Sequence, residues 1–130
     1  MKILKLSLLV FMFTLFSCSS TSQFPVSDVL PAARIEAKLS EDDNNNTEIE
    51  ITAHHLANPK RLSPSKNLYV VWVVTENGMV KNVGKMIQDG HKKVKLDIIT
   101  PFEVKEILIT AEDNGNVTKP GDMLITSKKI

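Results

Sequence analysis

The run from Tyr69 to Thr75 is apolar up to its last residue, and every residue in it is β-branched or aromatic. Such residues fit a pleated, packed surface, so this run predicts a β-strand. Its two faces carry Tyr69, Val71 and Val73 on one side and Val70, Trp72 and Val74 on the other. An edge strand would alternate apolar and polar residues, so this strand is predicted to be central. Tyr69, Val71, Trp72 and Val73 are therefore expected to belong to the core or to a partner-binding surface.

A second strand is expected directly after this run, because Asn77-Gly78 suits the positive φ angles of a two-residue hairpin turn. A turn of that length would pair Thr75 with Val80 and Val71 with Gly84, and it would place Trp72 opposite Val83. The stretch from Asn67 to Met86 is therefore predicted to form a β-hairpin.

Shorter segments with a period of two flank this hairpin and predict further strands. They cover residues 47–56, 94–100, 103–112 and 123–127, and clusters of Gly, Pro, Asn and Asp separate them. Segment 103–112 is expected to pair with the central strand. The pattern predicts an all-β fold, namely an antiparallel immunoglobulin-like sandwich of about seven strands.

Residues Ala32–Leu39 fit two kinds of element. Ile35 and Leu39 stand four apart among residue types that favour a helix. The same segment also alternates apolar and charged residues, as a half-buried strand does. We assign a strand, because Pro31 precedes the segment and the chain after it is β-like.

The N-terminal residues 1–17 have the pattern of a cleaved signal peptide. Lys2 and Lys5 precede an apolar run from Leu6 to Phe16, which is too short to cross a hydrocarbon layer of ~30 Å. The ending Leu15-Phe16-Ser17-Cys18 resembles the bacterial lipobox, which implies cleavage before Cys18 and lipid on its sulfur and amine. The alternative is a buried core cysteine, but Cys18, the only cysteine, lies among Ser and Thr.

Three parts of the chain follow from this pattern: a signal peptide at 1–17, a flexible tether at 18–30 and a sandwich domain at 31–130. The tether assignment rests on a composition rich in Ser and Thr, with Pro25 and no sustained period. Fully extended, it could hold the domain up to ~40 Å from the lipid.

The charge balance argues against two classes of partner. The chain has 16 basic and 15 acidic residues, and Lys2 and Lys5 would leave with the signal peptide. A nearly neutral domain has no electrostatic case for nucleic acid or for polybasic attraction to lipid headgroups. Membrane attachment is therefore expected to come from the acyl chains on Cys18.

A calcium loop is suggested by Asp42, Asn44 and Asn46, which match its first three ligand positions. The match then fails, because Thr47 stands where Gly is needed and Ala53 where a bidentate Glu is needed. We therefore expect a polar hairpin loop.

Zinc is suggested by the neighbours His54 and His55. Adjacent residues on a strand point to opposite faces, so these two cannot chelate one ion together. A site would need a distant partner such as His91. We predict no metal site and no cofactor.

Several residues of the predicted strands and turns form a pattern that resembles a known family. They are Tyr69, Trp72, Asn77-Gly78, Asn82-Val83-Gly84, Phe102, the run Ile107–Glu112 and Pro120-Gly121. The set resembles the extracytoplasmic C-terminal domain of anti-sigma-K factors and the small β-sandwich modules related to it. The resemblance implies a sandwich and an envelope-sensing or protein-contacting role. It does not imply sigma binding, because a lipobox stands in place of the family's helical sigma-binding part and spanning helix.

Catalytic motifs are not visible: the sequence has no Gly-x-Ser-x-Gly elbow, phosphate loop or HExxH. The expected function is that of a lipid-anchored, non-enzymatic envelope protein that contacts another protein or has a structural role. The alternatives are a ligand- or glycan-binding module and an envelope-sensing domain of anti-sigma-like ancestry. Ser19 after the cysteine favours the outer membrane, on its periplasmic or surface face.

Overall fold

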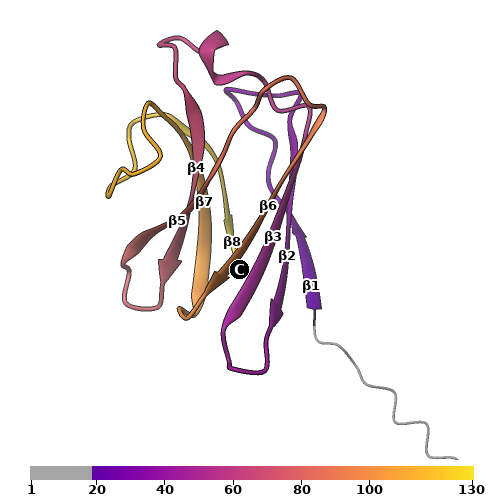
Figure 1. Cartoon of the computed structure of the whole chain (residues 1–130), viewed down its shortest axis with the longest axis vertical. Coiled ribbons are helices and arrows are strands. Elements are labelled where there is room, and N and C mark those ends of the chain that lie inside the picture. Colours follow the sequence, from indigo (N-terminus) through magenta and orange to yellow (C-terminus); the bar gives the residue numbers. More distant parts are fainter. Residues whose placement is uncertain (1–18) are drawn as a thin grey trace, which may run out of the picture.

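The computed structural model describes residues 19–130, which form two packed antiparallel β-sheets (Figure 1). The strands are β1 (Ser19–Gln23), β2 (Arg34–Glu41), β3 (Thr47–His54), β4 (Leu68–Thr75), β5 (Val80–Met86), β6 (Lys93–Thr100), β7 (Val104–Glu112) and β8 (Leu124–Lys129), with one short 3-10 helix, η1 (Pro59–Arg61). One sheet, here called sheet A, has the order β1-β2-β3-β6, and sheet B has the order β5-β4-β7-β8.

The connectivity confirms the predicted sandwich. In sheet A, β3 pairs with β6, and in sheet B, β4 pairs with β7, so each sheet joins strands that are distant in sequence. These two pairings correspond to B with E and C with F in the immunoglobulin fold. Strands β2 to β8 therefore make the expected seven, and β1 adds an eighth at the edge of sheet A.

The core lies between the sheets and is built by period-two alternation. In β2, Ile35, Ala37 and Leu39 are buried while the charged residues between them are partly or fully exposed, so this ambiguous segment is a strand. It begins at Arg34, two residues later than expected. Ile49 and Ile51 of β3 face it across the ladder, paired with Leu39 and Ala37.

The hairpin β4–β5 forms, but its turn is longer than predicted. The N–H of Gly78 donates to the Thr75 carbonyl (2.9 Å), and the N–H of Thr75 donates to the Met79 carbonyl (2.9 Å). These bonds pair Thr75 with Met79, so the loop has three residues. Within this turn only Gly78 has positive φ (+78°), which places the glycine in the position of a bulge.

This longer turn shifts the register by one residue near the loop. Val74, not Thr75, pairs with Val80, and Trp72 lies opposite Asn82 rather than Val83. An irregularity between Val71 and Trp72 restores the expected register, so Val71 pairs with Gly84 as predicted. The irregularity between Val71 and Trp72 is thus a second bulge, and it compensates for the extra residue in the turn.

The segment predicted to be a flexible tether is part of the sandwich over its described residues, 19–30, so that prediction was wrong. Strand β1 pairs with β2 along five residues, from Ser19 opposite Ser40 to Gln23 opposite Glu36. After it, Phe24 and Leu30 are buried in the core. Polar β1 carries no period-two signal, because it lies at an edge and four of its five residues are exposed.

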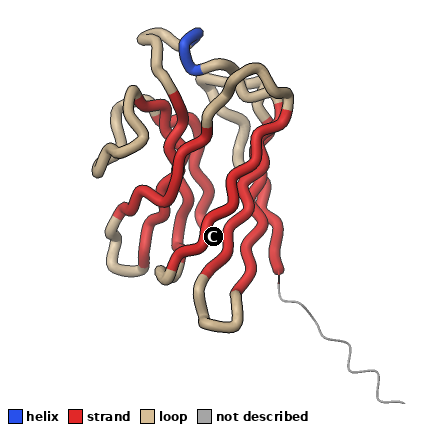
Figure 2. The backbone as a smooth tube through the Cα atoms, viewed as in Figure 1, coloured by secondary structure: helices blue, strands red, loops and turns tan. Residues whose placement is uncertain are grey.

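The sandwich has two dissimilar ends, visible as the tan segments of Figure 2. The short turns 42–46, 76–79 and 101–103 meet at one end, here called the turn end, where β1 starts and β8 finishes. The longer connections 24–33, 55–67, 87–92 and 113–123 meet at the other, here called the loop end. Among residues 19–130 no helix has the length and apolar character to cross a bilayer.

The buried hydroxyl of Tyr69 is expected to make the fold less stable at high pH. It donates to the Ala57 carbonyl (2.6 Å), and burial raises the pKa of Tyr69 to about 12. Ionisation is thus easier in the unfolded chain, whose tyrosine titrates near 10. This stabilisation should be complete below pH 10 and lost as pH rises from about 10 to 12.

We expect Tyr69→Phe to lower the free energy of unfolding by about 1 kcal/mol at pH 7. At pH 11.5, the wild type should have lost about 2 kcal/mol more than the variant. Urea unfolding of both proteins at pH 7 to 11.5 measures this. The lysines titrate over the same pH range in both proteins, so only the difference between the two pH profiles reports on Tyr69. Parallel profiles would contradict the prediction.

Candidate functional site

The four residues predicted to form a core or partner surface are all internal. Tyr69, Val71 and Val73 point into the core between the sheets, and each is 0% exposed. Trp72 is also 0% exposed but faces the outer side of sheet B. Tyr69, Val71 and Val73 therefore lie in the core between the sheets, Trp72 is buried on the outer face of sheet B, and none of the four is exposed to a partner.

Trp72 is covered by the β7–β8 connection, residues 113–123. Asn82, opposite Trp72 in β5, donates through Nδ2 to the Gly115 and Val117 carbonyls, both at 2.9 Å. In Figure 1 this connection folds back along the outside of sheet B. A polar loop of this kind carries no apolar signal that would identify it as a cover in the sequence.

A chain of buried hydrogen bonds fastens this loop. Trp72 Nε1 donates to Thr110 Oγ1 (2.8 Å), whose hydroxyl donates to Glu112 Oε2 (2.8 Å). The same carboxylate oxygen accepts the N–H of Gly121 (3.0 Å). A Cβ on Gly121 would lie 2.5 Å from Glu112 Oε1, so glycine permits the close approach. Each polar group in this series of hydrogen bonds thus has a partner, and the series holds the loop in place.

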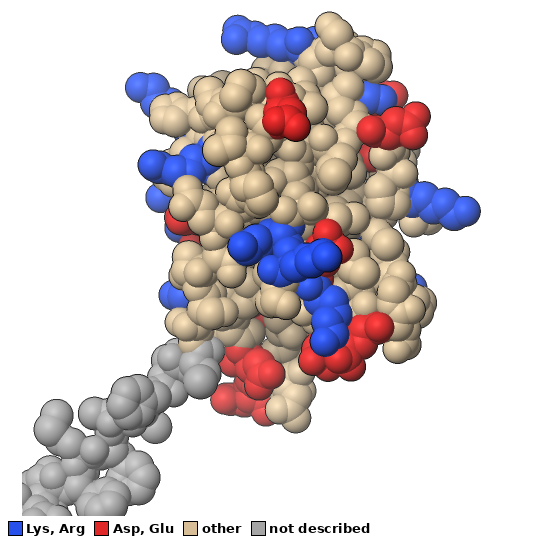
Figure 3. Space-filling view, turned by 180° about the vertical axis from the view of Figure 1, so that it is seen from behind, with Lys and Arg blue, Asp and Glu red and all other residues tan. Residues whose placement is uncertain are grey.

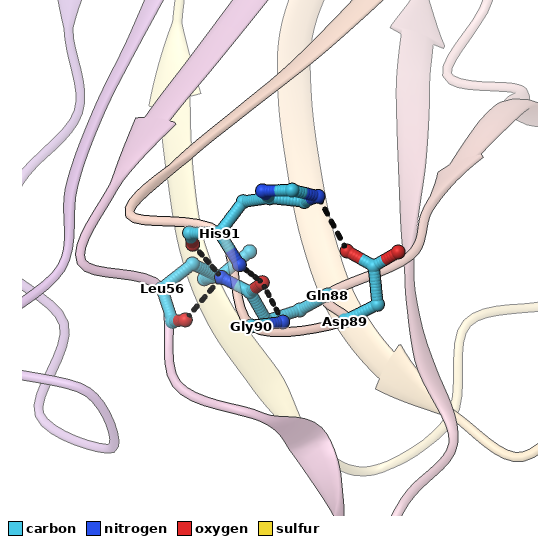
Figure 4. Close-up of polar contacts among 5 residues, drawn as sticks. All are labelled: Leu56, Gln88, Asp89, Gly90 and His91. Atoms are coloured by element: carbon cyan, nitrogen blue, oxygen red, sulfur yellow. Dashed lines mark hydrogen bonds and ion pairs between the residues drawn. The ribbon is translucent and has the colours of Figure 1, made fainter.

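A second buried polar residue, Gln88, organises the loop end (Figure 4). Its Nε2 donates to the Leu56 and His91 carbonyls, both at 2.7 Å. Its Oε1 accepts the N–H groups of Gly90 and His91, both at 3.0 Å. All of these partners are backbone groups, so Gln88 joins the 87–92 and 55–67 connections.

The histidines do not converge. His54 ends β3, His55 follows it with a φ of +55°, and His91 lies in the 87–92 connection against the exposed carboxylate of Asp89 (3.3 Å). Within residues 19–130 no group of three or more His, Cys, Asp or Glu side chains is placed to hold a metal ion.

The suggested calcium loop uses its first acidic side chain internally. Asp42 Oδ1 accepts the N–H groups of Asn44 (2.9 Å) and Asn46 (2.8 Å), and Oδ2 accepts from Asn46 Nδ2 (3.1 Å). The Asn46 hydrogen bond is the main reason that the pKa of Asp42 is lowered. The turn is thereby closed by its own side chains, as a polar hairpin loop requires.

The other shifted groups belong to exposed ion pairs. Glu50 on the outer face of sheet A pairs with Lys95 (3.0 Å), and this hydrogen bond lowers the pKa of Glu50. At the turn end, Glu76 pairs with Lys105 (3.0 Å), which lowers the pKa of Glu76 and raises that of Lys105. Each shift has a local, solvent-exposed cause, so neither pair shows the desolvated geometry of an acid–base centre.

Two surface hollows differ in chemistry. A hollow of about 380 Å³ on the outer face of sheet A has charged lining residues, among them Lys38, Glu50 and Asp97. A groove of about 580 Å³ lies at the loop end. Its apolar lining residues are Val29, Pro64, Met123 and Leu124, and Lys66, Gly121 and Asp122 complete it. Val29 and Leu124 are exposed there, so this groove is the candidate functional site that the sequence did not indicate.

Cys18, the predicted lipidation site, lies outside the described residues. The next residue, Ser19, is the first residue of strand β1 and lies at the turn end. The candidate groove lies at the other end.

Comparison with known proteins gives no match: no family model, curated protein or solved structure is significantly similar to this chain. The resemblance to the anti-sigma-K domain therefore stays a prediction.

Thr110→Val tests the buried chain over Trp72. It removes the acceptor of the indole N–H and one donor to Glu112, so we expect a loss of about 1 to 3 kcal/mol in the free energy of unfolding. Denaturant unfolding followed by Trp72 fluorescence measures it. The control is Thr52→Val, at a buried threonine of sheet A outside this chain; equal losses in the two variants would contradict the role of Thr110.

Proposed function

We propose that this chain is a lipid-anchored cell-envelope protein, held by acyl chains on Cys18, whose β-sandwich is non-enzymatic and contacts other envelope proteins. The observation that carries the proposal is the sequence Leu15-Phe16-Ser17-Cys18 at the end of a signal-peptide pattern, with Cys18 the only cysteine. Ser19 after the cysteine favours the outer membrane.

The geometry of the described domain is compatible with such an anchor. Strand β1 begins at the residue after Cys18, so a lipid there would lie next to a folded edge of sheet A. The groove with Val29 and Leu124 lies at the opposite end, where an anchored domain would meet other proteins. Its apolar lining suits an extended apolar segment of an envelope protein.

Glycan binding is less well supported. Sugar-binding sites commonly stack rings on exposed aromatic side chains, which combine a broad apolar face with polar edges. Of the aromatic residues in the described chain, Phe24, Tyr69 and Trp72 are buried, and Phe102 lies at the turn end with 39% exposure. The loop end thus has no exposed aromatic residue among those described.

Cys18→Ser tests the anchor. The wild type should incorporate radiolabelled palmitate and sediment with membranes, because the thiol is the acyl acceptor. The variant should incorporate none and should be found as a soluble or unprocessed species. A wild type that does not incorporate palmitate would contradict the proposal. Tyr69→Phe, which leaves Cys18 intact, is the control for the effect of a substitution on expression.

A photoreactive amino acid at Leu124 tests the protein contact. We expect one discrete protein adduct in intact cells, and we expect Val29→Glu to abolish it by placing a charge in the groove. The control is the same amino acid at the exposed Lys119, in the neighbouring 113–123 connection. Identical adducts from both positions would indicate random collision and contradict the assignment of the groove.

A further inference from the structure

The absence of a linker between Cys18 and the fold constrains where the domain can lie. Ser19 is already paired with Ser40 in sheet A, and one extended residue spans only about 3.5 Å. If Cys18 is acylated, as the proposed function requires, the surface around Ser19 must lie at the lipid headgroups. We infer that the turn end of the sandwich is a lipid-contacting surface, and that the domain stands on the membrane in a defined orientation.

The side chains of the turn end suit an interfacial position. Met79, Ile99, Phe102 and Ile130 lie in or beside its turns and chain terminus, and they are 46%, 66%, 39% and 46% exposed. Side chains of this kind gain free energy when they leave water, and the headgroup boundary is where apolar groups of peripheral proteins lie. The acyl anchor would bring all four to that boundary.

A lysine beside Phe102 also suits a position at the headgroup layer. The Lys81 ammonium lies 5.9 Å from the centre of the Phe102 ring. A lysine can rest its aliphatic stem on apolar groups while its charge stays among the polar headgroups. The Thr47 hydroxyl donates to the Phe102 carbonyl (3.2 Å), which ties this turn to the start of β3.

The hairpin nearest the anchor is acidic. Glu41, Asp42 and Asp43 lie in the β2–β3 hairpin, and acidic side chains gather beside the first described residues in Figure 3. These charges would be repelled by an anionic surface. The hairpin itself therefore does not favour an anionic surface, whereas Lys81, Lys128 and Lys129 at the same end carry the opposite charge, so the turn end has both signs of charge at headgroup level.

Three exposed isoleucines allow a matched test. Ile99 (66% exposed) and Ile130 (46%) lie at the turn end, and Ile87 (58%) lies at the loop end. Each is replaced by cysteine in the full chain, as Ile99→Cys, Ile130→Cys or Ile87→Cys, and labelled with an environment-sensitive fluorophore. The lipidated proteins are reconstituted into phosphatidylcholine vesicles with and without doxyl-labelled lipid.

We expect a blue shift and quenching by doxyl lipid at Ile99 or Ile130, or at both, and neither at Ile87. Equal quenching at all three positions, or the strongest quenching at Ile87, overturns the orientation. Crosslinking of the turn-end positions to a second copy or to another protein, without quenching, overturns the lipid contact.

The mass of the purified protein separates this inference from the proposed function. An acylated Cys18 without position-dependent quenching overturns only the orientation. An unmodified Cys18 thiol overturns the proposed function, and the inference that rests on it.

Discussion

The covering of β4 on both faces is the constraint on which the structure depends. Its inner face packs against sheet A through Tyr69, Val71 and Val73. Its outer face carries Trp72, which no second layer of secondary structure covers. A loop provides that cover, and the buried hydrogen bonds from Trp72 through Thr110 and Glu112 to the backbone at Gly121 hold the loop in place.

This arrangement explains how a polar loop can cover an apolar strand. The 113–123 connection contributes backbone carbonyls to Asn82 and a backbone N–H to Glu112. These partly buried backbone groups need partners, and here two polar side chains of sheet B supply them. The loop thus excludes water from Trp72 without contributing a hydrophobic cluster of its own. As a result, the outer face of sheet B at Trp72 is closed to a partner.

Sequence reasoning succeeded where side-chain alternation decides the structure. Strands β2, β3, β6, β7 and β8 follow from apolar residues with a period of two, and β4, with its pairing to β7, follows from an unbroken run of β-branched and aromatic residues. It failed where polar residues are ordered by backbone pairing. Strand β1, the 113–123 cover and the Gln88 contacts all consist of residues that a sequence pattern assigns to loops.

One signal could have reduced these errors. Phe24 and Leu30 are isolated large apolar residues in the supposed tether, and both are in the core. A tether with two core anchors cannot be freely flexible. The register of the β4–β5 hairpin could not be predicted from the sequence, because Asn77-Gly78 is compatible both with a two-residue loop and with a three-residue loop.

The ordering of residues 19–30 changes what an anchor on Cys18 would do. A flexible tether of that length would let the domain rotate freely and sample a large volume above the membrane. A paired edge strand instead joins the anchor to sheet A through the β1–β2 ladder. The same polar residues that look like a spacer in the sequence then become the element that fixes orientation. An anchored sandwich of this kind presents its loop end outward because its first strand, and not a linker, follows the cysteine.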